Sequence, residues 1–559
     1  MMSEITWEPP GPGVWELETV HAQRPTTKTV QMGWGEGLSA GFRHGTARYG
    51  VMLDYLQPDS VNSFMYMQAR PFGAPPGAMG PPPTPVLWLL TRLHPKMRAR
   101  IKQAKKAFDE KLWRADLKEW DTVDRPEIVA KHRAIEAVDV EFLADEQLAA
   151  HLTTVFDHLK HAHWMHHKYT VPSTLVVGDL LAGVMEWTGL EAAEVLGLIR
   201  GTSQISLGFA ATELTSAAAA IRSNPEARDV LADSGDAQAV LDKLMGHPDV
   251  GPAVTGYINA VRYRGMGYDV CDRNAGEMPE SLVDALRSAL DGATAAPIDT
   301  GLEKRIRDLV PDEHKADFDE RLAESRLMSR LRDERGVYSD GWATGLMRRA
   351  LLEAGRRLSG RGLLHEAEHA VELAADEAGA LLRDGDGPSA DEVAERFAWR
   401  MSHTIEDAPV FLGGEPSPPP DSSILPPAAR RTDRAMGVML ATLFAPSDRE
   451  ADETTVRGIP VHPGVYEGVA RLVGHASEFS RIKRGDVLVT RATSPYFNVI
   501  LPMLGAIVTD RGGALSHAAI VAREYGIPGV VGTREATATI PDGARVRVDG
   551  TNGEVTILA

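Results

Sequence analysis

The segment of this chain best suited to carry chemistry runs from residue 510 to residue 532 and reads DRGGALSHAAIVAREYGIPGVVG. A β-type run ends at Asp510, and the two glycines that follow allow backbone shapes closed to other residues. Ser516 stands where a helix N-cap belongs, so His517 falls in the first turn of a helix that ends at Gly526. We therefore predict an imidazole at a helix N-terminus, beside a diglycine turn.

An imidazole in this position is suited to accept a phosphoryl group. The N–H groups and the dipole at a helix N-terminus favour an anion, and a neutral imidazole is a competent nucleophile toward phosphorus. We expect Gly512, Gly513 and Ser516 to bind the phosphoryl group formed on His517. The alternative is that His517 is an ordinary histidine at a helix start, packed beneath a loop.

Further motifs surround this segment: VHPGVYEG at 461–468, GDVLVT at 485–490, GAIVTD at 505–510 and VDG at 548–550. Together they make the region from Gly458 onward resemble the mobile histidine domain of the PEP-utilising enzymes. That family includes pyruvate phosphate dikinase, PEP synthase, rifampin phosphotransferase and the phenylphosphate synthase subunits. The resemblance implies that His517 is the phosphocarrier and that its domain swivels. Where many members have Thr-Ser-His, this chain has Leu515-Ser516-His517.

The composition changes along the chain and predicts four zones. Residues 1–90 are mixed and end in a Pro-rich connector, residues 91–412 show the apolar spacing of helices, residues 413–454 form a Pro-rich linker with a short helix, and residues 455–559 alternate β-type runs with turns. We therefore predict a multi-domain fold. A mostly α-helical central domain precedes a compact α/β swivelling phosphohistidine domain, and the resemblance makes the helical domain the binding site of the acceptor.

Smaller signals refine this organisation. Gly251-Pro252 and the GDGP run at 385–388 indicate helix ends. A short helix is expected near Arg434–Phe444, and β-strands are expected at 486–490, 506–510 and 545–549.

The composition also excludes several classes of protein. The formal charge of −18 disfavours nucleic acid and anionic membranes as partners. With Cys271 as the single cysteine, an intrachain disulfide framework and a cysteine-built metal site are impossible. The acidic start lacks the features of a signal peptide, and the best apolar run, 499–508, is too short to span a bilayer. We therefore expect a cytoplasmic protein.

Transfer to a hydroxyl requires a base for its proton and cations for the phosphoryl oxygens. One set of candidates lies in a single short segment: Tyr263, Arg264, Asp269, Arg273 and Glu277. A second is His163 with His167, which are four residues apart and share a helix face. The alternative interpretation is a solvated helix end with its salt bridges, and a polar helix face that is rich in histidine. Without a paired carboxylate at suitable spacing, we expect no metal site there.

The resemblance also implies partners. The order of a helical region followed by a histidine domain is similar to rifampin phosphotransferase without its ATP-grasp domain, and to the histidine subunit of phenylphosphate synthase. No Walker loop is present, and the first zone is too short for an ATP-grasp domain. A separate ATP-grasp subunit would then bind ATP and Mg²⁺, load His517, and release AMP and phosphate.

The acceptor is expected to be a small molecule with a hydroxyl group. By analogy with phenylphosphate synthase, we expect a phenol or another aromatic alcohol. The sequence leaves open a second function, in which a phosphocarrier or regulatory protein relays phosphate from PEP or ATP to another protein. A third, a partner-binding protein with a vestigial histidine, fits the intact diglycine and Ser-His context less well.

Overall fold

The computed structural model describes residues 5–75, 77–78, 80–202, 210–290, 299–418, 420–444, 455–474, 476–493, 497 and 500–558. Parts of the expected Pro-rich connector and of the 413–454 linker therefore lie outside the described residues. The chain forms two compact units. The first consists of Met1–Leu175, Gly267–Asp272 and Glu334–Arg434, and the second of Val176–Met266, Arg273–Asp333 and Ala435–Ala559. His163 and His167 thus belong to the first unit, and His517 belongs to the second.

Helices dominate the described chain before residue 444. The first eight are α1 (Lys28–Tyr49), α2 (Thr84–Leu93), α3 (Pro95–Asp109), α4 (Leu112–Glu119), α5 (Arg125–Glu136), α6 (Asp145–Lys168), α7 (Thr170–Thr188) and α8 (Ala192–Leu196). Five more precede residue 300: α9 (Ala211–Ser223), α10 (Pro225–Ala232), α11 (Ala237–Gly246), α12 (Gly251–Val261) and α13 (Pro279–Leu290). The next six are α14 (Leu302–Leu309), α15 (Lys315–Tyr338), α16 (Asp340–Gly360), α17 (Ala375–Arg383), α18 (Ala390–Ser402) and α19 (Pro427–Phe444). The expectation of a helical central region is confirmed.

Prolines place two helix starts differently from the prediction. Gly251-Pro252 begins α12 and does not end a helix, and α19 begins at Pro427, seven residues before the expected start. In both cases proline occupies the first turn, where its missing N–H costs nothing and its fixed φ suits the helix. The run at 385–388 does separate α17 from α18, as predicted. Among the described residues, no helix has both the length and the apolar composition needed to cross a bilayer.

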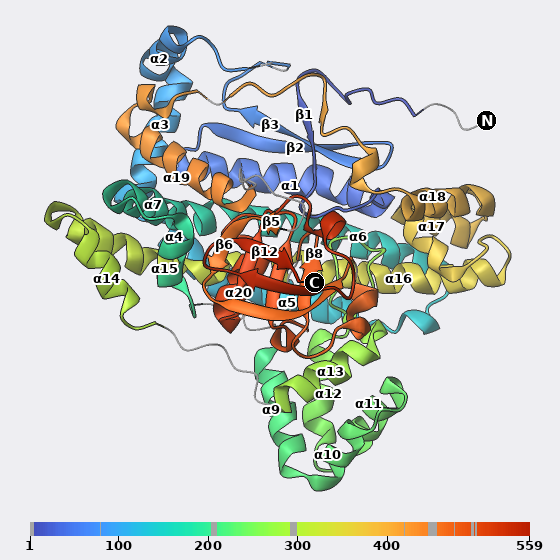
Figure 1. Cartoon of the computed structure of the whole chain (residues 1–559). Helices are drawn as coiled ribbons and strands as arrows, with labels where there is room; N and C mark the ends of the chain where they lie inside the picture. Colours follow the sequence, from blue (N-terminus) through green and yellow to red (C-terminus); the bar gives the residue numbers. More distant parts are fainter. Residues whose placement is uncertain are drawn as a thin grey trace. The chain divides into compact units, whose positions relative to one another are not determined.

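The first unit contains a four-stranded antiparallel sheet in the order β2-β3-β1-β4. Its strands are β1 (Trp15–Leu17), β2 (Leu53–Val61), β3 (Phe64–Pro71) and β4 (Phe411–Leu412). Trp15, Phe64 and Tyr66 are buried in one hydrophobic cluster with Leu412. Met65, the β3 residue between Phe64 and Tyr66, packs instead against Val30, Trp34 and Leu38 of α1, which runs along the sheet (Figure 1). The alternation of the β3 side chains thus places α1.

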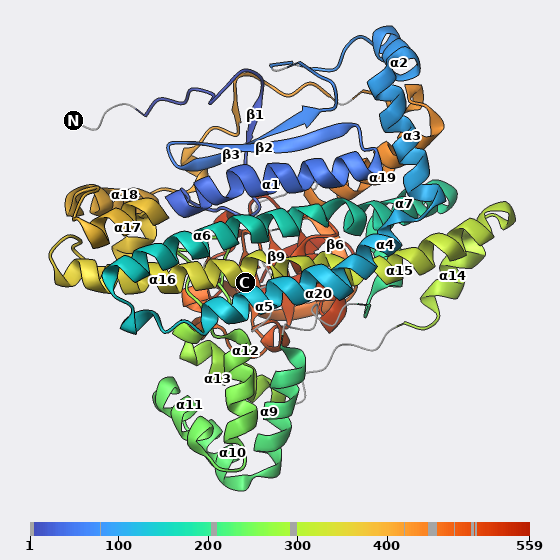
Figure 2. The same ribbon diagram turned by 180° about the vertical axis from the view of Figure 1, so that it is seen from behind.

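Glycines bring α1 close to α6, the helix that carries His163 and His167 (Figure 2). Four of them recur every fourth residue on one face of α1: Gly33, Gly37, Gly41 and Gly45. A Cβ added at Gly37 would lie 2.6 Å from the carbonyl oxygen of Lys160, and one at Gly41 would lie 2.6 Å from that of Trp164. Only residues without a side chain permit this approach of the two backbones.

The C-terminal part of the second unit is built on an eight-stranded sheet in the order β5-β12-β11-β7-β8-β9-β10-β6. Its strands are β5 (Thr455–Arg457), β6 (Ile459–His462), β7 (Val465–Leu472), β8 (Val487–Thr490), β9 (Ala506–Thr509), β10 (Gly529–Val531), β11 (Arg545–Asp549) and β12 (Glu554–Ile557). Strands β7 to β10 are parallel, and the remaining pairs are antiparallel. The three predicted strands are confirmed.

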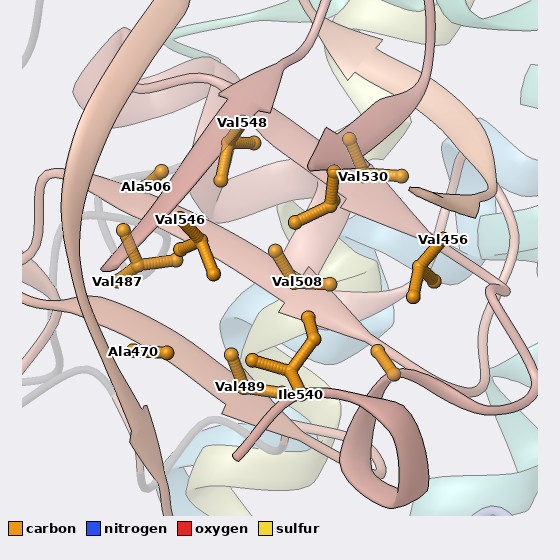
Figure 3. Packing of buried hydrophobic residues seen from close by; sticks show 12 residues of the cluster. Val456, Ala470, Val487, Val489, Ala506, Val508, Val530, Ile540, Val546 and Val548 are labelled. Carbon is orange, nitrogen blue, oxygen red and sulfur yellow. The ribbon is translucent and has the colours of Figure 1, made fainter. Parts of the chain in front are cut away.

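Small β-branched residues fill the core of this domain. Val487, Val489, Val508, Val546 and Val548 are fully buried together, and their side chains converge between the strands (Figure 3). The helices α20 (His517–Tyr525) and α21 (Ala536–Thr539) complete the domain. This part of the chain is the α/β module expected from the sequence.

Two matched substitutions test the packing of α1 on α6. We expect Gly41→Ala to destabilise the protein by about 1–3 kcal/mol, because its Cβ forces the two helices apart. Gly35 lies on the same helix with nothing within 4 Å of its Cβ position. Gly35→Ala should therefore stabilise the protein by about 0.5–1 kcal/mol through helix propensity. Urea unfolding of both variants beside the wild type measures the difference, and equal effects of the two substitutions would contradict this packing.

Candidate active site

The candidate site lies where two neighbouring parallel strands end. Strand β8 pairs with β9 over their whole lengths, up to Thr490 opposite Thr509. The pairing continues beyond both strands, since the N–H of Asp510 donates to the carbonyl of Thr490 (3.1 Å). The segments that follow, ending in Thr493 and in Ser516-His517, therefore emerge at the same edge of the sheet. This edge is where ligands bind in open α/β sheets.

Local sequence determines how His517 is held. Ser516 is the N-cap of α20 and its hydroxyl accepts a hydrogen bond from the N–H of Ala519 (3.4 Å), while Gly526 ends the helix at φ +66°. Gly512 has φ +99°, and a Cβ there would lie 2.6 Å from the Cβ of Ser516. The structure thus confirms the predicted helix, with His517 as its first residue.

The imidazole of His517 is neutral and oriented. Its Nδ1 lies 3.0 Å from the hydroxyl oxygen of Thr493. Burial, with a contribution from the positive charge of Arg332, lowers the pKa of His517 to about 3. In the tautomer whose Nδ1–H donates to Thr493, the lone pair is on Nε2, which is then the nucleophilic atom. The arrangement can therefore take up a phosphoryl group at neutral pH without first losing a proton.

The C-terminal end of α19 contacts the loop that precedes His517. The N–H of Gly513 donates to the carbonyl of Leu443 (2.9 Å), and that of Leu515 donates to the carbonyl of Thr442 (3.1 Å). A Cβ at Gly513 would lie 2.1 Å from the Thr442 oxygen, so only glycine permits this contact. The N–H of Gly513, expected to bind a phosphoryl group, is thus engaged by α19 in this conformation.

Two residues of this site were not predicted from the sequence. Thr493 lies three residues beyond the end of β8, so the predicted strand at 486–490 was the one signal that pointed toward it. Arg332 of α15 donates from Nη2 to the carbonyl of Leu515 (2.6 Å), more than 180 residues away in the sequence. No sequence signal identifies such a long-range contact.

The candidates between Tyr263 and Glu277 fall in both units. In the second, the backbone folds back on itself, with the N–H of Met266 donating to the carbonyl of Arg273 (2.7 Å) and that of Ala275 to Arg264 (2.9 Å). Arg264 is buried and Arg273 is exposed. The carboxylate of Glu277 accepts from the N–H of Asn274 (2.8 Å). This turn brings the candidates of the second unit close together in space. Each of the contacts described joins two residues of this one segment.

Asp269 belongs to the first unit, where its carboxylate accepts hydrogen bonds from the N–H (2.8 Å) and the hydroxyl (2.5 Å) of Thr27. Thr27 is the N-cap residue of α1. A carboxylate at a helix N-terminus is favoured by the helix dipole. In this conformation Asp269 therefore stabilises the start of α1.

Three histidines of α6, His163, His166 and His167, belong to a largely buried polar cluster in the first unit. The Nδ1 of His166 lies 2.8 Å from Oδ1 of Asp340, and the Nδ1 of His163 lies 3.8 Å from its Oδ2. His167 stacks on Phe42 of α1, with ring centroids 5.0 Å apart. Burial lowers the pKa of each of these three imidazoles and raises the pKa of Asp340. The cluster therefore holds neutral imidazoles beside one carboxyl group.

An unsatisfied donor lies next to this cluster. Trp34 of α1 packs edge-on against His163, and its indole Nε1 is buried without a hydrogen-bond partner. Buried polar atoms are nearly always paired with protein, water or ligand. Within the described part of the chain, no three His, Cys, Asp or Glu side chains gather in a way that could hold a metal ion.

Comparison with known proteins identifies the C-terminal module. Residues 482–553 match the family described as PEP-utilising enzyme, mobile domain. Two relatives of the chain are phosphotransferases by name. A rifampicin phosphotransferase of Streptomyces sviceus is 28% identical over 67% of this chain and 42% of its own length. The uncharacterized phosphotransferase YvkC of Bacillus subtilis is 32% identical over 44% of this chain and 28% of its own length.

A third relative matches over a shorter stretch at higher identity. A phosphoenolpyruvate synthase of Aeropyrum pernix is 47% identical over 20% of this chain and 14% of its own length. The matched parts amount to less than half the length of each of these three relatives.

The neutrality of His517 can be measured directly. Because its pKa is about 3, below the ordinary value of 6.5, its imidazole should stay uncharged from pH 8 down to pH 5. In the unfolded chain the ring takes up a proton below about pH 6.5, so this histidine destabilises the fold as the pH falls. The ¹³Cε1–¹H resonance of His517 is assigned as the one that is missing in His517→Gln. We expect its chemical shift to stay constant from pH 8 to pH 5. A midpoint near 6.5 would contradict the lowered pKa of this half-buried ring.

Proposed function

We propose that this protein is a phosphotransferase that carries a phosphoryl group on Nε2 of His517. The observation that carries the proposal is the neutral imidazole at the start of α20, oriented by Thr493 at the edge of β8 and β9. It lies within the segment that matches the PEP-utilising enzymes. Ser516 and the glycines 512 and 513 would bind the phosphoryl oxygens through the loop and the helix N-terminus.

ATP would be the source of the phosphoryl group, bound with Mg²⁺ mainly by a separate ATP-grasp subunit. In the loading reaction ATP and water become AMP and phosphate, and one phosphoryl group ends on His517. The resemblance to the PEP-utilising enzymes supports this division of labour. The names of its relatives, rifampicin phosphotransferase and phosphoenolpyruvate synthase, support phosphoryl transfer as the activity.

Loading would require α19 to leave the loop formed by residues 511–516 before His517, here called the histidine loop. The carbonyls of Thr442 and Leu443 occupy the N–H groups of Leu515 and Gly513. A helix C-terminus carries a partial negative charge, which repels a phosphoryl group. We infer that the histidine domain swivels on the segment 413–454, and that release of α19 accompanies the movement.

The acceptor would be a hydroxyl group of a small molecule, for which a phenol or another aromatic alcohol is the first choice. During transfer the Nε2–P bond breaks, an O–P bond forms, and the hydroxyl proton passes to a base. The neutral histidines His163 and His167, with His166 held by Asp340, are candidates for that base. Tyr263, Arg264, Asp269, Arg273 and Glu277 remain candidates for binding the acceptor or the phosphoryl oxygens.

Loading is tested by intact-mass analysis after incubation with ATP, Mg²⁺ and a candidate ATP-grasp partner. We expect an acid-labile gain of one phosphoryl group that is absent in His517→Ala. Thr493→Val should slow the gain by about tenfold or more, because the imidazole loses the partner that fixes its tautomer, whereas Thr493→Ser should load normally. Gain from PEP but not from ATP would favour the relay function, and no gain from either donor would refute the carrier.

Transfer is tested on protein loaded in this way and then offered phenols and alcohols. We expect His163→Gln or His167→Gln to load normally and to discharge to the acceptor about 100-fold more slowly, as expected for loss of a general base. His365→Gln is the matched control, since His365 is exposed and pairs with Asp391 on the surface. Discharge of both variants at the wild-type rate would remove these histidines from the reaction.

A further inference from the structure

A small pocket in the second unit is bordered by three arginines from three different elements. Arg523 comes from α20, Arg332 from α15, and Arg200 from the segment that follows the 3₁₀ turn Gly197–Ile199. The carboxylates that also line the pocket are Asp333 and Glu524. The cavity volume is about 30 Å³, room for about two oxygen-sized atoms. A nucleotide or an aromatic alcohol is therefore too large for it, whereas a small oxyanion can place two of its oxygens there.

Hydrogen bonds within the pocket leave Arg523 incompletely paired. Arg200 donates from Nη2 to the carbonyl of Glu524 (2.9 Å), and its Nε lies 3.9 Å from the carboxylate of the same residue. That carboxylate also accepts from the N–H of Gly201 (3.0 Å). The side chain of Arg523, only 6% exposed, has its Nη1 buried without a hydrogen-bond partner. Glu524 is thus bound mainly by Arg200 and Gly201, and not by Nη1 of Arg523.

The electrostatics of Arg523 favour an anion beside its guanidinium group. Burial and the positive charges of Arg332 and Arg200 lower its pKa to about 9, and Glu524 offsets only part of this effect. A guanidinium remains charged even so at pH 7, and a buried charge without a full partner is costly. Guanidinium groups bind phosphate oxygens through paired, charge-assisted hydrogen bonds.

We propose that this pocket binds one small inorganic oxyanion, with orthophosphate as the ligand that matches its size and charge. The ion would accept from Nη1 of Arg523 and bridge α20 to α15. The site differs from the phosphoryl position on His517, because its lining includes Leu515, Ile520 and Arg523 but not the imidazole. Binding therefore does not rest on the proposed transfer function.

Isothermal titration of the full chain with sodium phosphate, at constant ionic strength maintained with chloride, tests the proposal. We expect one saturable site in the wild type and in His517→Ala. Arg523→Met, which keeps the length and removes the charge, should weaken binding by at least about tenfold. Arg545→Met is the matched control, since Arg545 is an exposed arginine of the same unit and should leave binding unchanged.

Several outcomes would overturn the site. These are the absence of saturable binding in the wild type, equal binding in Arg523→Met, or loss of binding in His517→Ala alone. If thermal unfolding shows that Arg523→Met does not fold, Arg523→Lys provides the second variant. It retains the charge but lacks the guanidinium fork, and we expect weaker phosphate binding at an unchanged unfolding midpoint. Unweakened binding in Arg523→Lys would contradict the bidentate contact.

Discussion

The parallel pairing of β8 with β9 is the constraint on which the candidate site depends. Because parallel strands end at the same edge, the segment after β8 and the loop after β9 meet there. The pairing extends past both strands through the bond from Asp510 to Thr490, so the register is also fixed in the loops. The buried valines on these strands resist any slip, since a shift by one residue would turn them out of the core. Thr493 and His517 can therefore meet only in this register.

Positive charge collects around α20 in a chain whose formal charge is −18. Arg332 donates to the carbonyl of Leu515, Arg523 lies further along α20, and Arg200 borders the same pocket as both. Burial, together with the charge of Arg332, keeps the imidazole of His517 neutral. A histidine domain that handles phosphoryl groups gains from such surroundings, because they favour anions and disfavour protonation of the carrier. The carbonyl end of α19 has the opposite effect, so under the proposed function its contact with Gly513 and a bound phosphoryl group would exclude each other.

In the first unit, the close packing of α1 on α6 positions the histidines of α6. The glycines of α1 remove the side chains that would separate it from α6. The close approach then places Trp34 against His163 and Phe42 against His167. Four-residue spacing of glycines was a readable pattern, but its meaning depends on which helix lies opposite. The surroundings of these histidines thus depend on how closely the backbones of α1 and α6 approach each other.

The sequence by itself determined the local part of this protein. Residues 510–532 contain the strand end, the N-cap Ser516, the first-turn His517 and the helix end Gly526, because these features depend on neighbours within one turn. Helix starts at Gly251 and Pro427 were misplaced, because a proline near a helix boundary fits either an end or a first turn. Only the tertiary structure decided that Thr493, Arg332 and the end of α19 meet the histidine loop, and that Asp340 meets His166. Those contacts join residues far apart in the chain, and the packing that selects them acts on volume and charge in space, which no local pattern records.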